Sequence, residues 1–227
     1  MTNFDIKIVS DTVCPWCYVG KKRLEQGIAA YKQKYPDSND TFATTWFPFY
    51  LVPDAPKSVD KRAYYESKFG EARTAAIFQR MTALGKDEGI DFKFGGRTGN
   101  TRDSHRLIQL GKKKSPDVQT RVIEELFTAY FENEKDITSQ GVLIEAGVKA
   151  GLDLNEAKEW LEQGKGGEEV DKEVQDAYRQ NIHGVPNYTI NDQFEIGGAQ
   201  EPSAFVQLFE RLKRQEGNVK VASDSKC

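Results

Sequence analysis

The sequence SDTVCPWC, residues 10–17, joins a predicted strand to a predicted helix. Before it, apolar and polar residues alternate from Phe4 to Ser10, which is typical of a β-strand. After it, apolar residues recur at near-helical spacing as far as about Tyr35, and Pro36 ends the pattern. Pro15 has no amide hydrogen and a preset φ, which suits the first position of a helix. Two cysteines therefore stand where a strand leads into a helix.

The chain has three cysteines, Cys14, Cys17 and Cys227. An odd count with one close pair does not indicate a framework of structural disulfides. The chain opens without a basic segment and an apolar run, so we expect no secretory leader and a cytoplasmic protein. In a reducing compartment a Cys-x-x-Cys pair is more often redox-active or metal-binding than structural. A zinc site needs further paired ligands, whereas His105 and His183 stand alone, so no metal is predicted.

The position of Cys14 favours a thiolate over a thiol, because the free N–H groups and the dipole of a helix start are positive. Nearby cations at residues 21–23 act in the same direction. Cys17 lies one turn later on the same side, where it can attack a mixed disulfide formed at Cys14. The alternative is a pair of ordinary buried thiols. The strand-to-helix position and the proline in second place favour the redox interpretation.

The rest of the chain predicts the order β-α-β, a long all-α insertion, then β-β-α. Residues 42–51 are rich in aromatic and β-branched side chains and predict a second strand, parallel to the first. Two short strands, 188–190 and 193–196, flank an Asn191-Asp192 turn, and an amphipathic helix covers 202–214. The insertion is predicted to hold helical segments at residues 61–88, 101–113, 117–132, 141–150, 154–163 and 168–181.

This order predicts a discontinuous α/β domain, residues 1–57 and 181–215, interrupted by a helical domain at 58–180. Residues 216–227 are polar, and we expect a flexible tail there. The net charge of −3 leaves no basic excess for a phosphate backbone, so nucleic acid is not an expected partner. The longest apolar stretch, residues 46–52, is far short of the roughly 18 residues that a membrane span needs, so no membrane is expected.

A second motif, Gly184-Val185-Pro186, precedes the third strand. Pro186 cannot donate to a sheet, so it fits a bend or a cis bond at the entry to the strand. A cis proline would leave the backbone of Val185 beside the sulfurs, where it could pair with an extended peptide or with glutathione. Ordinary turn chemistry is the alternative.

Several of these segments together resemble the DsbA-like thioredoxin family. The chain is similar to its cytosolic FrnE-type branch, beside the 2-hydroxychromene-2-carboxylate isomerases and the kappa-class glutathione transferases. The resemblance implies a thioredoxin fold with a helical insertion, attack by Cys14, resolution by Cys17 and a cis Pro186. It covers roughly residues 5–212 and is carried by the motifs at residues 10–21, 100–107, 126–131, 184–186 and 197–200.

The same resemblance places Asn100, His105 and Arg106 near a groove facing the dithiol, with Gln200 as a further groove residue. A capped helix start with a hydrogen-bonded histidine is an equal explanation for His105. The isomerase and transferase branches carry Ser in place of Cys14. They also differ at Val52, where the family pattern more often has Asn, and at Gln200, where the kappa branch tends to be acidic. These departures favour dithiol chemistry over a dedicated glutathione site.

Three candidate functions follow, given in order of preference. The first is a thiol–disulfide oxidoreductase that acts on protein or small-molecule disulfides or thiols, with Pro15, Trp16, Val185 and Pro186 supporting the dithiol. The second is a glutathione-dependent transferase or isomerase for a small aromatic substrate, and the third is a binding module without catalysis. No tightly bound cofactor is expected, and glutathione is a candidate co-substrate. A homodimer and a role for Cys227 remain open at this point.

Overall fold

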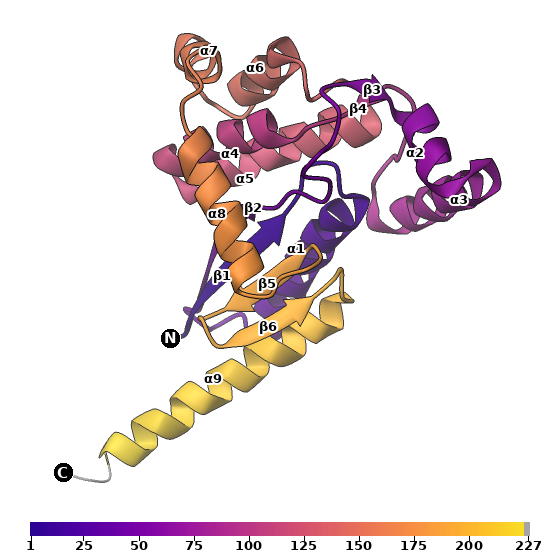
Figure 1. The fold of residues 1–227 in the computed structure, drawn as a ribbon. Helices are drawn as coiled ribbons and strands as arrows, with labels where there is room; N and C mark the ends of the chain where they lie inside the picture. Colours follow the sequence, from indigo (N-terminus) through magenta and orange to yellow (C-terminus); the bar gives the residue numbers. More distant parts are fainter. Residues whose placement is uncertain (225–227) are drawn as a thin grey trace.

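The computed structural model describes the backbone of residues 1–224 and the side chains of residues 1–215. Its main sheet has the strand order β2-β1-β5-β6 (Figure 1). β1 runs parallel to β2 and antiparallel to β5, and β5 is antiparallel to β6. The predicted parallel β-α-β unit and the final pair of antiparallel strands are thus confirmed. The strands are β1 (Asn3–Ser10), β2 (Thr41–Pro48), β5 (Asn187–Ile190) and β6 (Phe194–Gly197).

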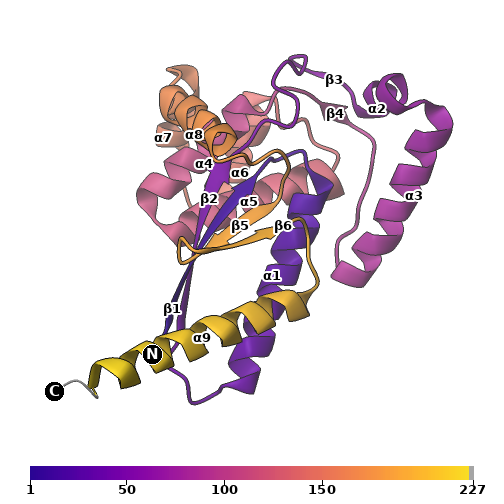
Figure 2. The same cartoon turned by 60° about the horizontal axis from the view of Figure 1, so that its bottom comes forward.

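Helices α1 (Pro15–Lys34) and α9 (Pro202–Asp224) contact each other and cover one face of this sheet (Figure 2). Phe4 of β1 is buried between them. Its ring centroid lies 5.5 Å from that of Tyr31 in α1 and 4.9 Å from that of Phe209 in α9. The alternation in the first strand therefore has its predicted cause, a buried face packed by aromatic side chains. This packing places the start of α1 at the carboxyl end of β1.

The insertion between β2 and β5 lies above the sheet in Figure 1. Its helices α4, α5 and α8 contact β2, so the insertion packs directly against one edge of the sheet. The elements are β3 (Val59–Asp60), α2 (Lys61–Phe69), α3 (Glu71–Glu88), β4 (Arg97–Thr98), α4 (Arg102–Lys114), α5 (Pro116–Phe127), a π-helix (Thr128–Glu132), α6 (Gln140–Lys149), α7 (Leu154–Glu162) and α8 (Gly167–Arg179).

Four details differ from the sequence prediction. The helix expected over 61–88 is two helices, because Gly70 between them has φ +79°, which no helix accommodates. The insertion also contains the short sheet β3–β4, whose two-residue strands are too short to show alternation. β2 ends at Pro48 rather than Leu51. α9 runs to Asp224 instead of 214, so part of the expected tail is helical, and residues 225–227 lie outside the described residues.

Candidate active site

Cys14 is the residue immediately before helix α1, and its backbone is extended, with φ −88° and ψ 112°. Its N–H donates to the carbonyl of Asp11 at 3.1 Å, and its carbonyl accepts the N–H of Cys17 at 3.0 Å. Pro15 occupies the start of the helix as predicted, and the first turn contains no acidic residue. Cys14 therefore lies at a helix start whose free N–H groups and dipole favour a negative charge.

Cys17 is the more deeply buried of the two thiols, with 1% of its surface exposed against 4% for Cys14, and both are free. Burial and the adjacent Cys14 sulfur raise the pKa of Cys17 well above its ordinary value, and hydrogen bonds from Ser10 and the backbone of Asp11 act in the opposite direction. Cys17 therefore holds its proton at neutral pH while it contacts Cys14.

The loop before β5 lies directly beside Cys14. The Cys14 thiol donates to the carbonyl of Val185 across 3.6 Å, and the Val185–Pro186 peptide bond is cis. Pro186 is buried and packs beside Gly20 of α1. The structure thus brings both predicted loop residues to the dithiol, although they are more than 160 positions away in sequence.

Tyr188 lies in β5, just after this loop, and its side chain packs against Gly20 of α1. A Cβ placed on Gly20 would lie 2.2 Å from the Tyr188 hydroxyl, so the glycine allows this close approach. The hydroxyl is buried and has no hydrogen-bond partner in the described structure. Burial, together with the nearby Cys17 and Cys14, raises the pKa of Tyr188 well above its ordinary value. An unpaired polar atom therefore lies one helical turn from Cys17.

Asp11 and His105 form a buried pair between the end of β1 and helix α4. His105 Nε2 lies 3.3 Å from Asp11 Oδ1 and 3.1 Å from the carbonyl oxygen of Phe49. Both are acceptors, so Nε2 carries the proton. The other carboxylate oxygen of Asp11 accepts the N–H of Leu51 at 2.8 Å. His105 thus links the insertion, through a hydrogen bond, to Asp11 in the segment that carries the dithiol. Its Nε2 is therefore engaged in hydrogen bonds and is not free.

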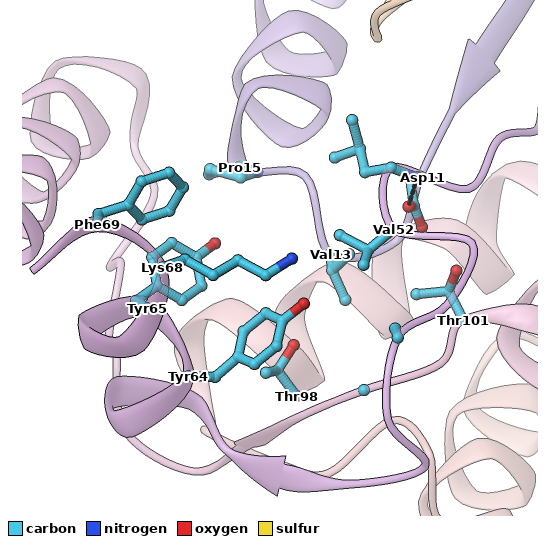
Figure 3. A pocket seen from close by; sticks show the side chains of 13 residues that line it. Asp11, Val13, Pro15, Val52, Tyr64, Tyr65, Lys68, Phe69, Thr98 and Thr101 are labelled. Carbon is cyan, nitrogen blue, oxygen red and sulfur yellow. Dashed lines mark hydrogen bonds between the residues drawn. The ribbon is translucent and has the colours of Figure 1, made fainter.

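A pocket of about 280 Å³ opens beside the dithiol (Figure 3). Val13 and Pro15, the neighbours of Cys14 on either side, form one wall, and helix α2 forms the opposite wall. Most of the lining is apolar or aromatic. The lining residues are Asp11, Val13, Pro15, Leu51, Val52, Ala55, Tyr64, Tyr65, Lys68, Phe69, Thr98, Gly99 and Thr101.

Lys61 is the first residue of α2, and its buried contacts hold the first turn of α2 in place. They therefore also hold the α2 wall of the pocket. The residue is 2% exposed, and its ammonium donates to the carbonyl of Tyr130 at 3.0 Å and lies 3.7 Å from the centre of the Tyr130 ring. The Tyr130 carbonyl belongs to the π-helical turn. Burial lowers the pKa of Lys61 to about 8, although Glu134 acts in the opposite direction.

We expect the wild-type protein to gain stability between pH 8 and pH 10 relative to Lys61→Met. The folded state releases the Lys61 proton at about pH 8, whereas the unfolded chain holds it until roughly pH 10.4. The unfolded state therefore binds more protons in this window, and the free energy of unfolding rises by about 2 kcal/mol relative to the variant. Urea unfolding at several pH values measures this difference, with the exposed Lys57→Met as control. Parallel pH curves for wild type and Lys61→Met would contradict it.

The other predicted groove residues lie elsewhere or have local roles. Arg106 is buried in the insertion, where its guanidinium donates to the carbonyls of Trp160, Leu161 and Lys165. Asn100 accepts the N–H of Arg102 at the start of α4 and does not line the pocket.

Two further predicted residues can also be placed. The Gln200 side chain donates back to the carbonyl of Gly197 at the end of β6. Trp16 is half-buried against the core, with the Arg80 guanidinium 5.9 Å from its ring. The cations after Cys17 are partly neutralised, because buried Lys21 pairs with Glu25 and Glu124.

Residues that the sequence analysis did not single out also belong to the site. Asp11 was visible as an acidic residue at the end of a buried strand. Tyr64, Tyr65, Lys68 and Phe69 share one face of a predicted helix, but nothing local indicated that this face meets Cys14. Within the described part of the chain, no group of three or more His, Cys, Asp or Glu side chains could hold a metal ion. In the same part, no helix is long and apolar enough to cross a bilayer.

A β2-β1-β5-β6 sheet with a dithiol at the start of its first helix, facing a Val-Pro loop before the third strand of the sheet, defines a thioredoxin-fold protein with a Cys-x-x-Cys pair. Residues 5–210 match the family described as DSBA-like thioredoxin domain, and the chain belongs to this family. The predicted fold, a thioredoxin fold with a helical insertion, is confirmed.

Known proteins similar to the chain fit this assignment. The chain is 25% identical over 200 residues to the uncharacterised protein YwbO of Bacillus subtilis, covering 86% of this chain and 90% of that protein. The crystal structure of a "probable DsbA oxidoreductase" from Streptomyces coelicolor has a TM-score of 0.82 at 25% identity, covering 92% and 89% of the two chains.

Two more distant structures share the fold. One is a 2-hydroxychromene-2-carboxylate isomerase, with a TM-score of 0.65 at 14% identity over 95% and 98% of the two chains. The other is the cytosolic disulfide reductase DsbM from Pseudomonas aeruginosa with glutathione, with a TM-score of 0.60 at 13% identity over 92% and 99%.

Proposed function

We propose that the protein is a thiol–disulfide oxidoreductase in which Cys14 is the nucleophile and Cys17 the resolving thiol. The observation that carries this proposal is the contact of two free thiols at the start of α1, with the Cys14 thiol pointing at the Val185 carbonyl. The raised pKa of Cys17 supports the division of roles, because the thiol that keeps its proton is the poorer nucleophile.

In the reductive direction, the Cys14 thiolate attacks one sulfur of a substrate disulfide and releases the other as a thiolate. Cys17 then loses its proton and attacks the Cys14 sulfur of the mixed disulfide, which releases the second substrate thiolate. Two electrons pass from the dithiol to the substrate, and a Cys14–Cys17 disulfide remains. The reverse sequence oxidises a substrate dithiol. The reduction potential decides between these directions.

The backbone of Val185 and the pocket next to Pro15 are the elements we propose for holding the substrate. A substrate chain can pair with the backbone of Val185 as an added strand while an adjacent apolar group enters the pocket. Pro15 and Trp16 support the dithiol as the two residues between the cysteines in the first turn of α1, and Pro186 supports it by packing beside Gly20. We also propose a cytoplasmic location and glutathione as co-substrate, and the likeness in fold to DsbM, a cytosolic reductase with glutathione, supports both.

The redox equilibrium of the dithiol with glutathione tests this function. We expect the protein to cycle between a dithiol and a Cys14–Cys17 disulfide in glutathione buffers, which alkylation of free thiols and intact mass will count. Catalysed reduction of insulin should accompany this cycling. A protein that forms no internal disulfide at any ratio of reduced to oxidised glutathione would contradict the proposal.

The second candidate is a glutathione-dependent transferase or isomerase for a small aromatic substrate. The aromatic pocket next to Cys14 favours it, as does the shared fold of the isomerase. Calorimetric titration with glutathione separates the two: tight binding without dithiol turnover supports the second function. A protein whose Cys14 neither cycles between thiol and disulfide nor binds glutathione would support the third function, a binding module without catalysis.

A further inference from the structure

The pocket beside Cys14 has an apolar rim that is open to solvent. Leu51 and Phe69, which line it, are among the exposed large apolar residues of the protein, at 42% and 43% exposed. Solvent-exposed apolar side chains that border a cavity indicate a surface that an apolar group covers on binding. The cavity volume of about 280 Å³ is enough for one substituted aromatic ring, since a cavity of ~150 Å³ holds benzene.

Among the described residues, the lining of this mostly apolar pocket holds one cation, Lys68. Figure 3 shows the side chain of Lys68 crossing the pocket from α2 toward Val13. Its ammonium lies 4.7 Å from the centre of the Tyr64 ring and forms no ion pair with any side chain that the structure describes. A cation over an aromatic face keeps its charge available to a ligand.

The single carboxylate in the lining does not neutralise Lys68. Asp11 lies at the far end of the pocket, where its two oxygens bind the N–H of Leu51 and the ring of His105. No other acidic residue within residues 1–215 lines the pocket. The pocket therefore combines aromatic walls with an unpaired positive charge, and the two residues that flank Cys14, Val13 and Pro15, line it.

We propose that this pocket selects disulfides whose exchanging sulfur carries an aromatic or similarly apolar group together with a carboxylate, and that Lys68 determines this specificity. The proposal rests on the proposed thiol–disulfide chemistry of Cys14. The apolar part packs between Pro15 and Phe69, and the carboxylate pairs with the Lys68 ammonium. Lys68 is an exposed residue, so this ion pair is expected to contribute about as much as a surface pair, up to ~1 kcal/mol.

Two aromatic disulfides that differ in charge test the specificity. Dithiobis-nitrobenzoate has a carboxylate on each ring, and dithiobis-nitropyridine has none. Pre-reduced protein converts each disulfide to two coloured thiolates while its own dithiol becomes a disulfide, so a single turnover needs no other reductant. The second-order rate constant with each disulfide is the measured quantity.

Lys68→Gln is expected to lower the rate constant with the nitrobenzoate disulfide about fivefold and to leave that with the nitropyridine disulfide unchanged. Lys68→Arg should restore most of the loss, because it restores the charge. Lys32→Gln is the matched control: Lys32 also lies over an aromatic ring, 5.5 Å from the centre of the Phe42 ring, but outside the pocket. It should leave both rate constants near wild type.

Phe69→Ala tests the apolar half of the pocket. Phe69 is exposed, so its removal should not disturb folding. We expect both aromatic disulfides to react about threefold more slowly, since part of the apolar contact area is lost, whereas the small uncharged hydroxyethyl disulfide should react at the wild-type rate.

Equal slowing of both aromatic disulfides by Lys68→Gln would overturn the proposal, as would equal effects of Lys68→Gln and Lys32→Gln. A wild-type protein that reduces none of the disulfides would contradict the proposed function itself. The failure of the specificity proposal is therefore distinguishable from the failure of the underlying chemistry.

Discussion

Replacement of Cys14 by serine is expected to reduce the catalysed reduction of disulfides to the uncatalysed rate, a loss of more than about 10³-fold. A serine hydroxyl cannot form the mixed disulfide, and the thiol that remains at the start of α1, Cys17, is only 1% exposed and has a raised pKa, so it is a poor replacement nucleophile. The folded structure should survive, because serine is close to cysteine in size and is accepted at the residue before a helix. Insulin reduction measures the activity, and circular dichroism checks the fold.

Cys17→Ser should behave differently from Cys14→Ser. Cys14 can still attack, so the variant should accumulate a mixed disulfide with the substrate that intact mass detects at one adduct per chain. Turnover should stop, since the resolving thiol that contacts Cys14 is gone. Cys227→Ser is the matched control, because it removes a cysteine at the end of the chain. Equal turnover in all three variants would show that the dithiol is not the reactive centre.

Gly20→Ala is expected to destabilise the protein by about 2 kcal/mol. The added methyl carbon would lie 2.2 Å from the Tyr188 hydroxyl and 2.9 Å from Cγ of Pro186. Tyr188 is fully buried in the sheet and cannot move away easily. This clash outweighs the ~1 kcal/mol that alanine gains over glycine inside a helix. The substitution should also slow disulfide exchange, because Pro186 and Tyr188 would be displaced beside the dithiol.

Tyr188→Phe should restore much of the stability lost in Gly20→Ala. It removes the oxygen that meets the methyl group, and in the wild type that buried hydroxyl has no partner to lose. Tyr188→Phe by itself should therefore leave stability unchanged or raise it by up to about 1 kcal/mol. Urea unfolding of the wild type, the two single variants and the double variant gives the interaction energy between the two substitutions. Strictly additive effects of the two substitutions would contradict this contact.

The first strand, the start of α1 and the spacing of the two cysteines were predictable because each depends on local sequence. The alternation of β1, the proline at the start of α1 and the two cysteines one turn apart each act over a few residues. The same holds for the bend at Pro186 and the Asn191-Asp192 turn, where both residues have positive φ.

The differences between the prediction and the structure have both local and long-range causes. Gly70 interrupts a helical pattern through its backbone conformation, which the apolar periodicity around it does not reveal. Arg106 belongs to a motif that the resemblance placed by the groove, yet its hydrogen bonds go to carbonyls near the end of α7. A motif can be recognised from sequence without showing which of its side chains faces the site.

The sequence by itself determined the order of the elements and the position of the dithiol, because hydrogen bonding and apolar periodicity within a strand or helix are local. Only the tertiary structure decided what surrounds the sulfurs. The Asp11–His105 pair, the Tyr188 hydroxyl under Gly20 and the Lys68 side chain across from Pro15 join residues from separate elements. The contacts of His105 and Lys68 depend on how the insertion packs against β2 and α1, and the contact of Tyr188 depends on how β5 packs against α1. Such long-range packing of side chains leaves no periodic signal in the chain.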